Sequence, residues 1–161
     1  MGTSKVADVR ETIVRGARGE ARADGSAGIE AEHILLALAA QDGSPAQRLL
    51  AGAGLDHDAI RVALDREWEH TLSHAGLVVQ VAGLPAASAD PARRPQIAES
   101  AKLALKRAMA AAAATGGGRI GPVHLLVGVL QAPLGRVPRA LGLAGVDRAA
   151  LMDRAVAELA R

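Results

Sequence analysis

Three side chains that can ligate a metal ion lie close together in the sequence: Glu67, His70 and His74. Their spacing of three and four residues places them on one face if a helix continues that far. A carboxylate with two imidazoles is a donor set that Zn²⁺ accepts. The pattern is not the His-Glu-x-x-His of zinc hydrolases, and it falls where a predicted helix gives way to a linker. A solvated helix end is therefore the expected arrangement, and a zinc-dependent hydrolase is the remote alternative.

Two further histidines, His33 and His124, stand alone in their predicted helices, because neither has a second ligand three or four residues further on. Each is expected to pack at a helix start and to hydrogen-bond a loop carbonyl. The sequence therefore predicts no metal site and no cofactor.

Other catalytic signatures are missing from the sequence. The chain has no cysteine, which excludes thiolate nucleophiles and thiolate metal sites. It contains no Gly-x-Ser-x-Gly elbow, and the glycine-rich stretch 116–121 lacks the lysine and the hydroxyl of a phosphate-binding loop. We therefore expect a protein that is not an enzyme.

The charge pattern argues against nucleic acid and membrane partners. The chain carries 19 Lys and Arg against 17 Asp and Glu, and basic pairs such as Arg93-Arg94 have no interleaved aromatic rings for stacking on bases. No apolar run approaches the roughly 18 residues of a membrane span. The first residues, MGTSKVADVRET, are charged where a signal peptide would be apolar. A cytoplasmic location is the expectation.

The composition favours closely packed helices. Half of the chain is hydrophobic, yet only 1% is aromatic and Trp68 is the sole ring. An interior of Ala, Leu, Val and Ile suits helices better than sheets. The sequence predicts an all-α fold.

The chain repeats itself once, at an offset of 91 positions, the separation of His33 and His124. No gap is needed, so a tandem repeat is the simplest account. Matching pairs along the two copies include Val14 and Leu105, Gly25 and Gly116, Ile29 and Ile120, Arg48 and Arg139, Leu50 and Leu141, Gly54 and Gly145, and Asp56 and Asp147.

Each copy has the pattern of four helices, with breaks at glycine-rich clusters. Pro45 and Pro122 suit first turns, and Asp56 and Asp147 suit N-caps. In the fourth helix of the first copy one face is apolar, at Ile60, Leu64 and Trp68.

We expect one domain over residues 1–161, with repeat one at about 4–70, a linker at about 71–95 and repeat two at about 96–160, packed about a pseudo-two-fold axis. Within the linker, Leu77–Val81 is β-prone, and a short strand or an extended segment laid over the helices would both fit.

The segment Glu30-Ala31-Glu32-His33-Ile34-Leu35-Leu36-Ala37-Leu38 resembles the Gly-Thr-Glu-His-(Ile/Leu)-Leu-Leu-Gly-Leu signature of the N-terminal domain of Clp AAA+ unfoldases, of the ClpC and ClpA type. Ile120-Gly121-Pro122-Val123-His124-Leu125-Leu126 resembles it again. The resemblance spans roughly residues 4–160. It implies a free-standing double Clp N repeat without ATPase modules.

The resemblance also implies binding residues. ClpC-type domains recognise phosphoarginine through the Glu of each signature and a Thr near the start of each repeat. Here Glu32 matches the first Glu, whereas Val123 replaces the second, and Ala7 and Ala98 replace the threonines.

Cyclic-peptide antibiotics bind relatives between the first helices of the two copies. The corresponding residues of this chain are Val6, Val14, Ile97 and Lys102. Closure of the interface between the two copies is an equally good explanation for these four side chains.

These observations lead to a non-catalytic binding module. It would bind peptides, adaptors or peptide antibiotics, as an accessory or decoy of the Clp proteolysis system, with Clp unfoldase or protease components as partners. A ligand receptor or adaptor unconnected to Clp proteolysis is the alternative.

Overall fold

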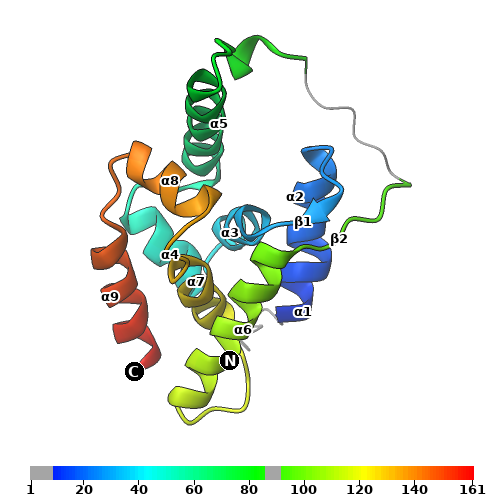
Figure 1. Cartoon of the computed structure of the whole chain (residues 1–161). Helices are drawn as coiled ribbons and strands as arrows, with labels where there is room; N and C mark the ends of the chain where they lie inside the picture. Colours follow the sequence, from blue (N-terminus) through cyan, green and yellow to red (C-terminus); the bar gives the residue numbers. More distant parts are fainter. Residues whose placement is uncertain (1–8, 86–91) are drawn as a thin grey trace.

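The computed structural model describes residues 9–85 and 92–161, so Val6 and Ala7 lie outside the described residues. Helices dominate both halves (Figure 1). The elements of the first half are α1 (Val9–Glu11), the π-helical turn η1 (Thr12–Ala17), α2 (Arg18–Ala23), β1 (Gly28–Ile29), α3 (Ala31–Ala39), α4 (Pro45–Gly52) and α5 (His57–His74). Those of the second half are the 3₁₀ turn η2 (Val81–Gly83), β2 (Gln96–Ile97), α6 (Glu99–Ala114), α7 (Pro122–Leu130), α8 (Arg136–Leu143) and α9 (Arg148–Leu159).

The predicted repeat is confirmed in the helix boundaries, because α7, α8 and α9 each begin 91 residues after α3, α4 and α5. Local chemistry explains these starts. The Ser44 hydroxyl accepts a hydrogen bond from the Gln47 N–H, with Pro45 at the first helical position. Asp56 caps α5 through the Ala59 N–H at 2.7 Å, and Asp147 caps α9 in the same way through Ala150.

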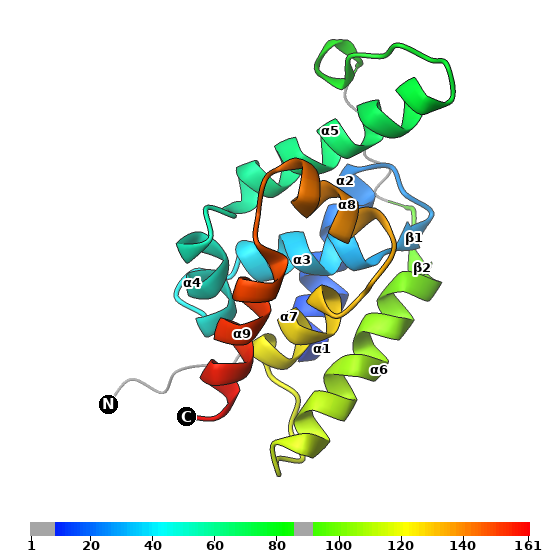
Figure 2. The ribbon, with the colours of Figure 1, turned by 60° about the vertical axis from the view of Figure 1, so that its left-hand side comes forward.

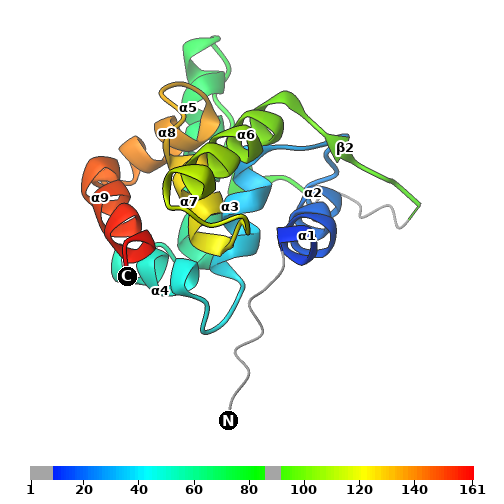
Figure 3. The same ribbon diagram turned by 90° about the horizontal axis from the view of Figure 1, so that it is seen from below.

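The two repeats interlock about a pseudo-two-fold axis. Helix α5 of the first repeat packs on α8 of the second, and α9 of the second packs on α4 of the first. Exchanging the two repeats turns one contact into the other, and the α4–α7 and α3–α8 contacts are related in the same way. Figures 2 and 3 show α9 beside α4. The all-α, pseudo-symmetric architecture predicted from the sequence is therefore confirmed.

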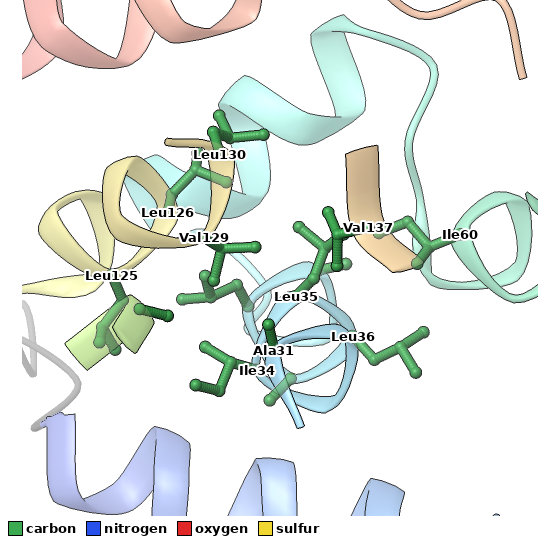
Figure 4. Packing of buried hydrophobic residues seen from close by; sticks show 14 of the residues in the cluster. Ala31, Ile34, Leu35, Leu36, Ile60, Leu125, Leu126, Val129, Leu130 and Val137 are labelled. Carbon is green, nitrogen blue, oxygen red and sulfur yellow. The ribbon is translucent and has the colours of Figure 1, made fainter. Parts of the chain in front are cut away.

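Helices α3 and α7 form the centre of the core. All nine residues of α3 and all but one of α7 are buried, as expected of helices that are apolar all round. Figure 4 shows Ile34 and Leu35 of α3 close to Leu126 and Val129 of α7. Gly128 permits the close approach of α6 and α7, since a Cβ there would lie 2.2 Å from the Ala104 carbonyl oxygen.

The linker contains less regular structure than its β-prone sequence suggests. Leu77–Gln80 form no strand, and Val78 is 95% exposed rather than laid over the helices. A strand needs a paired neighbour, and this segment has none among the described residues. The two short strands lie elsewhere, β1 pairing with β2 in parallel, Gly28 beside Gln96 and Ile29 beside Ile97.

Helix α5 departs from its predicted amphipathic face at the far end. Ile60 and Leu64 are buried, but Trp68 is 45% exposed. The reason is visible in Figure 2, where the C-terminal part of α5 extends beyond the rest of the helices. None of the described helices is long and apolar enough to cross a membrane.

Candidate binding site between the repeats

A charged cluster joins the two repeats beside the core. Arg136, at the start of α8, donates from Nη1 to Glu32 Oε1 at 3.1 Å and from Nε to Glu67 Oε2 at 3.2 Å. It also donates from Nη2 to the Leu64 carbonyl at 3.3 Å. Both glutamates are buried. One guanidinium thereby connects α3, α5 and α8. We call Arg136, Glu32 and Glu67 the Arg136 cluster.

Glu67 has further donors. Arg139 Nε lies 2.8 Å from its Oε1, and the Thr71 hydroxyl donates to the same oxygen at 2.8 Å. Burial raises the pKa of the Glu67 carboxyl, but the bonds from Arg139 and Thr71 and the charges of Arg139 and Arg136 outweigh it and hold the pKa below its usual value. Glu67 is therefore a structural anion at neutral pH.

The structure does not assemble Glu67, His70 and His74 into one site. Both carboxylate oxygens of Glu67 face the arginines of α8, whereas His70 and His74 are exposed at the helix end, with ring centroids 4.3 Å apart. The described ranges contain no group of three or more His, Cys, Asp or Glu residues arranged to hold a metal ion. The zinc-hydrolase alternative thus has no supporting geometry.

His33 and His124 hold the starts of α3 and α7. His33 Nδ1 accepts the Glu30 N–H at 2.9 Å, so its proton is on Nε2, which donates to Asp24 Oδ2 at 2.9 Å. His124 Nδ1 accepts the Gly121 N–H at 3.0 Å, and its Nε2 lies 3.2 Å from the Thr115 hydroxyl. The helix-start role is observed. The predicted carbonyl acceptor is wrong, because a carboxylate and a hydroxyl take its place.

Two cavities adjoin the Arg136 cluster, because Glu32 and Arg136 line both of them. The first, which we call the inter-repeat pocket, is small, about 80 Å³, and mainly apolar. Leu103 of α6 is 45% exposed at this pocket and Leu134, before α8, is 85% exposed. Its remaining lining includes Ala31, Glu32, Ser100, Ala104, Arg107, Val129, Arg136, Val137 and Pro138.

The second cavity, which we call the α5 cleft, is larger, about 570 Å³, and mixed in polarity. The cleft is lined by α5, the end of α2, the start of α3 and the segment 81–85, which packs on α5. Asp24 and Arg61 meet here, Nη1 to Oδ1 at 2.5 Å. Burial raises the pKa of Asp24, but hydrogen bonds from His33 and Arg61 and their charges lower it below its usual value.

The other residues that the sequence suggested for ligand binding do not gather around the two cavities. Ile97 lies in β2, 37% exposed, and Lys102 is an exposed residue of α6 whose ammonium lies 3.7 Å from Glu99. Neither lines the inter-repeat pocket or the α5 cleft. The backbone of Val14 belongs to η1. Val123 is buried, and Ala98 is the N-cap residue of α6.

Sequence reasoning missed Arg136. Its position corresponds to Pro45 in the first repeat, so the two copies differ at the start of their third helices. That difference was a visible signal, but nothing in the sequence says that the arginine reaches Glu32 and Glu67.

Comparison with known proteins decides the family. The sequence profile of the Clp repeat (R) N-terminal domain matches residues 7–88, about half of the chain. The chain belongs to this family. The profile covers the first repeat, and the second Clp repeat is evident from the matching helix boundaries. A search of curated proteins finds no match.

Solved structures agree with this family fold. The N-terminal domain of the caseinolytic protease-associated chaperone ClpD from Arabidopsis thaliana superposes with a TM-score of 0.69 at 22% identity, covering 94% of this chain and 96% of that domain. A structure from preliminary investigations of a malarial protein secretion system superposes with a TM-score of 0.62 at 19% identity, covering 94% of each chain. At these identities the likeness establishes the Clp N fold alone.

Proposed function

We propose that this Clp N domain is a non-catalytic docking module for peptide segments of adaptors or substrates, an accessory or decoy of a Clp proteolysis system. The observation that carries the proposal is the inter-repeat pocket, an apolar recess with Leu103 and Leu134 exposed at its edge. A leucine that is 85% exposed beside an apolar recess gains free energy when a partner covers it. The whole chain acts as one unit here, because the pocket takes residues from both repeats.

The Arg136 cluster defines which ligands suit this module. A phosphoarginine ligand would have to displace Arg136 from the Glu32 carboxylate, and Val123 offers no second carboxylate. Arg136 thus already pairs with the Glu32 carboxylate, the group that would bind the guanidinium of a ligand. An aliphatic side chain in the inter-repeat pocket requires no such displacement, and we propose this kind of ligand there.

Affinity capture from cells that contain the protein tests the proposal. The bait is used as wild type, as Leu134→Asp, which places a charge at the pocket edge, and as Val78→Asp, a matched change at an exposed apolar residue away from the pocket. Clp subunits or their adaptors recovered with wild type and Val78→Asp, but lost with Leu134→Asp, support the proposal. Equal recovery with all three baits, or none, would overturn it.

The alternative, a receptor unconnected to Clp proteolysis, is favoured by one observation: Val123 and Ala98 have lost the polar groups that relatives use. Reproducible recovery of a partner outside the Clp system, dependent on Leu134, would establish it.

A second surface for the same function comprises Val6, Val14, Ile97 and Lys102. A thermal-shift panel of phosphoarginine and cyclic peptides, with Glu32→Ala and Lys102→Ala, tests it. A cyclic-peptide shift lost in Lys102→Ala places the ligand on α6, and no shift removes this surface from the proposal. For phosphoarginine we expect no shift, because Arg136 already pairs with Glu32.

A further inference from the structure

The α5 cleft presents the protein's single aromatic side chain to solvent. Trp68, the only Trp, Tyr or Phe residue of the chain, is 45% exposed and lines this cleft together with Leu84, which is 51% exposed. Pro85 and Val81, from the segment that packs on α5, add to the apolar lining. An exposed tryptophan in a cavity of about 570 Å³ provides a flat π surface with room for a side chain beside it.

Asp65 lies on the same face of α5, three residues before Trp68, and lines the same cleft. It makes no hydrogen bond or ion pair within ranges 9–85 and 92–161. Burial raises the pKa of the Asp65 carboxyl, and the charges of Asp24 and Glu69 add to this, against the lowering effect of Arg136 and Arg61. Asp65 is exposed, and Arg136 and Arg61 attract its charge without forming an ion pair with it.

The other charges of the cleft are already paired. Arg61 donates to both Asp24 and Glu20, each at 2.5 Å, and Arg136 is held by Glu32 and Glu67. An anionic ligand would therefore meet only guanidinium groups whose charge is already balanced by carboxylates. A cationic ligand finds Asp65 without breaking any pair, so the cleft is complementary to positive charge.

We propose that the α5 cleft binds a basic side chain, arginine or lysine, of an extended polypeptide, with the Asp65 carboxylate accepting its hydrogen bonds and the Trp68 ring covering it. The carboxylate supplies a charge-assisted hydrogen bond, and the ring face attracts a cation. The inference rests on the proposed docking function only in that the ligand is a polypeptide, because the α5 cleft and the inter-repeat pocket are separate cavities.

Intrinsic fluorescence tests this directly, because Trp68 is the only fluorescent ring in the chain. The full chain is titrated with a blocked seven-residue Ala/Ser peptide carrying one central arginine, and with the same peptide carrying lysine, citrulline or glutamate. Citrulline keeps the shape of arginine without the charge. We expect a saturable change with arginine and lysine that weakens as salt is added, and affinity at least about tenfold lower for citrulline and glutamate.

Variants locate the ligand. Asp65→Asn should lower the affinity for the arginine peptide at least about tenfold, whereas Asp153→Asn, a matched change at an exposed carboxylate of α9, should leave it unchanged. Trp68→Leu, followed by calorimetry, should also weaken binding. Equal binding of the citrulline peptide, or equal affinity in Asp65→Asn, would overturn the proposal, as would the absence of a fluorescence change in the wild type.

The outcome is separable from that of the docking proposal. Leu134 does not line the α5 cleft, so Leu134→Asp should bind the arginine peptide like the wild type. A cleft that binds the peptide while Leu134→Asp has no effect on captured partners would leave this inference standing and overturn the inter-repeat pocket.

Discussion

Arg136 of the second repeat lies 3.1 Å from the carboxylate of Glu32, a residue of the first repeat's signature. The same guanidinium also binds Glu67, which pairs with Arg139 as well, so two guanidinium groups balance two buried carboxylates. This contact joins the two repeats, because Glu32 belongs to α3 and Arg136 to α8.

Removing Arg136 should destabilise the protein strongly. Arg136→Ala leaves Glu32 without its partner inside the protein, and we expect a loss of about 3 kcal/mol in the free energy of unfolding. Arg136→Lys should lose less, because it keeps the charge but not the planar fork. Urea unfolding measures both. Arg119→Ala, at an exposed arginine, should lie within about 0.5 kcal/mol of the wild type; a loss as large as that of Arg136→Ala would contradict the assignment.

Gly128 and Gly142 should respond to alanine with opposite signs. A Cβ at Gly128 would lie 2.2 Å from the Ala104 carbonyl oxygen, so α6 and α7 must separate, at a cost of about 2–3 kcal/mol. Nothing lies within 4 Å of a Cβ at Gly142 in α8, so Gly142→Ala should stabilise by about 0.5–1 kcal/mol. Thermal unfolding of the two variants measures both changes. Equal effects of Gly128→Ala and Gly142→Ala would contradict the close approach of α6 and α7 at Gly128.

The protein should lose stability in acid through Asp24 and Glu67. Both carboxyls have pKa values below the usual ones, so each stabilises the fold when ionised. That contribution is complete above the unfolded pKa values, about 4, and disappears as pH falls through the lower folded values. Glu67→Gln should be less stable at pH 7 and show a shallower loss between about pH 5 and about pH 2. An unchanged slope in denaturant unfolding would rule out this role for Glu67.

Asp65 should behave in the opposite way. Its folded pKa is raised, so the ionised carboxylate works against folding above its unfolded pKa, and the penalty vanishes in acid. Asp65→Asn should therefore be slightly more stable than the wild type at pH 7 and not at about pH 3. Unfolding at the two pH values tests this, and a loss of stability at pH 7 would contradict it. If Asp65→Asn is the more stable protein at pH 7, the wild-type carboxylate lowers the free energy of unfolding slightly while it provides the proposed binding group.

The two signature histidines should differ in importance. His33 is 2% exposed and bridges the start of α3 to Asp24, whereas His124 is half-buried and faces a hydroxyl. His33→Ala should cost about 2 kcal/mol, because the Glu30 N–H and the Asp24 carboxylate both lose a partner. His124→Ala should cost about 1 kcal/mol. Chemical denaturation of the two variants measures both losses in the free energy of unfolding. A larger loss for His124→Ala would contradict the stronger role of His33 at the start of α3.

The helices could be predicted from the sequence because their signals are local. Apolar spacing, the N-cap residues Asp56 and Asp147, and Pro45 act within one or two turns and determine where α4, α5 and α9 begin. The repeat offset then determines that two similar units must pack. Trp68 shows the limit of such reasoning, because its exposure depends on how far α5 extends beyond its neighbours.

The candidate site was predicted only in part. Glu32 was recognised from the signature, but its partner lies 104 residues away in the chain, and no local pattern connects them. Asp65 had no signal at all, since a carboxylate on a helix surface is ordinarily solvated. Its place in a cleft with Trp68 depends on the segment 81–85 lying across α5.

Arg48 and Arg139 show most clearly where sequence ends and tertiary structure begins. The repeat matches them, and both lie in third helices. Arg48 donates to the nearby Gly43 carbonyl, whereas Arg139 donates to the buried Glu67 of the other repeat. The sequence determined the helices, their caps and the duplication, because those depend on neighbours in the chain. Only the packing of α8 on α3 and α5 decided that Arg136 and Arg139 meet Glu32 and Glu67, because charge pairing depends on distance in space.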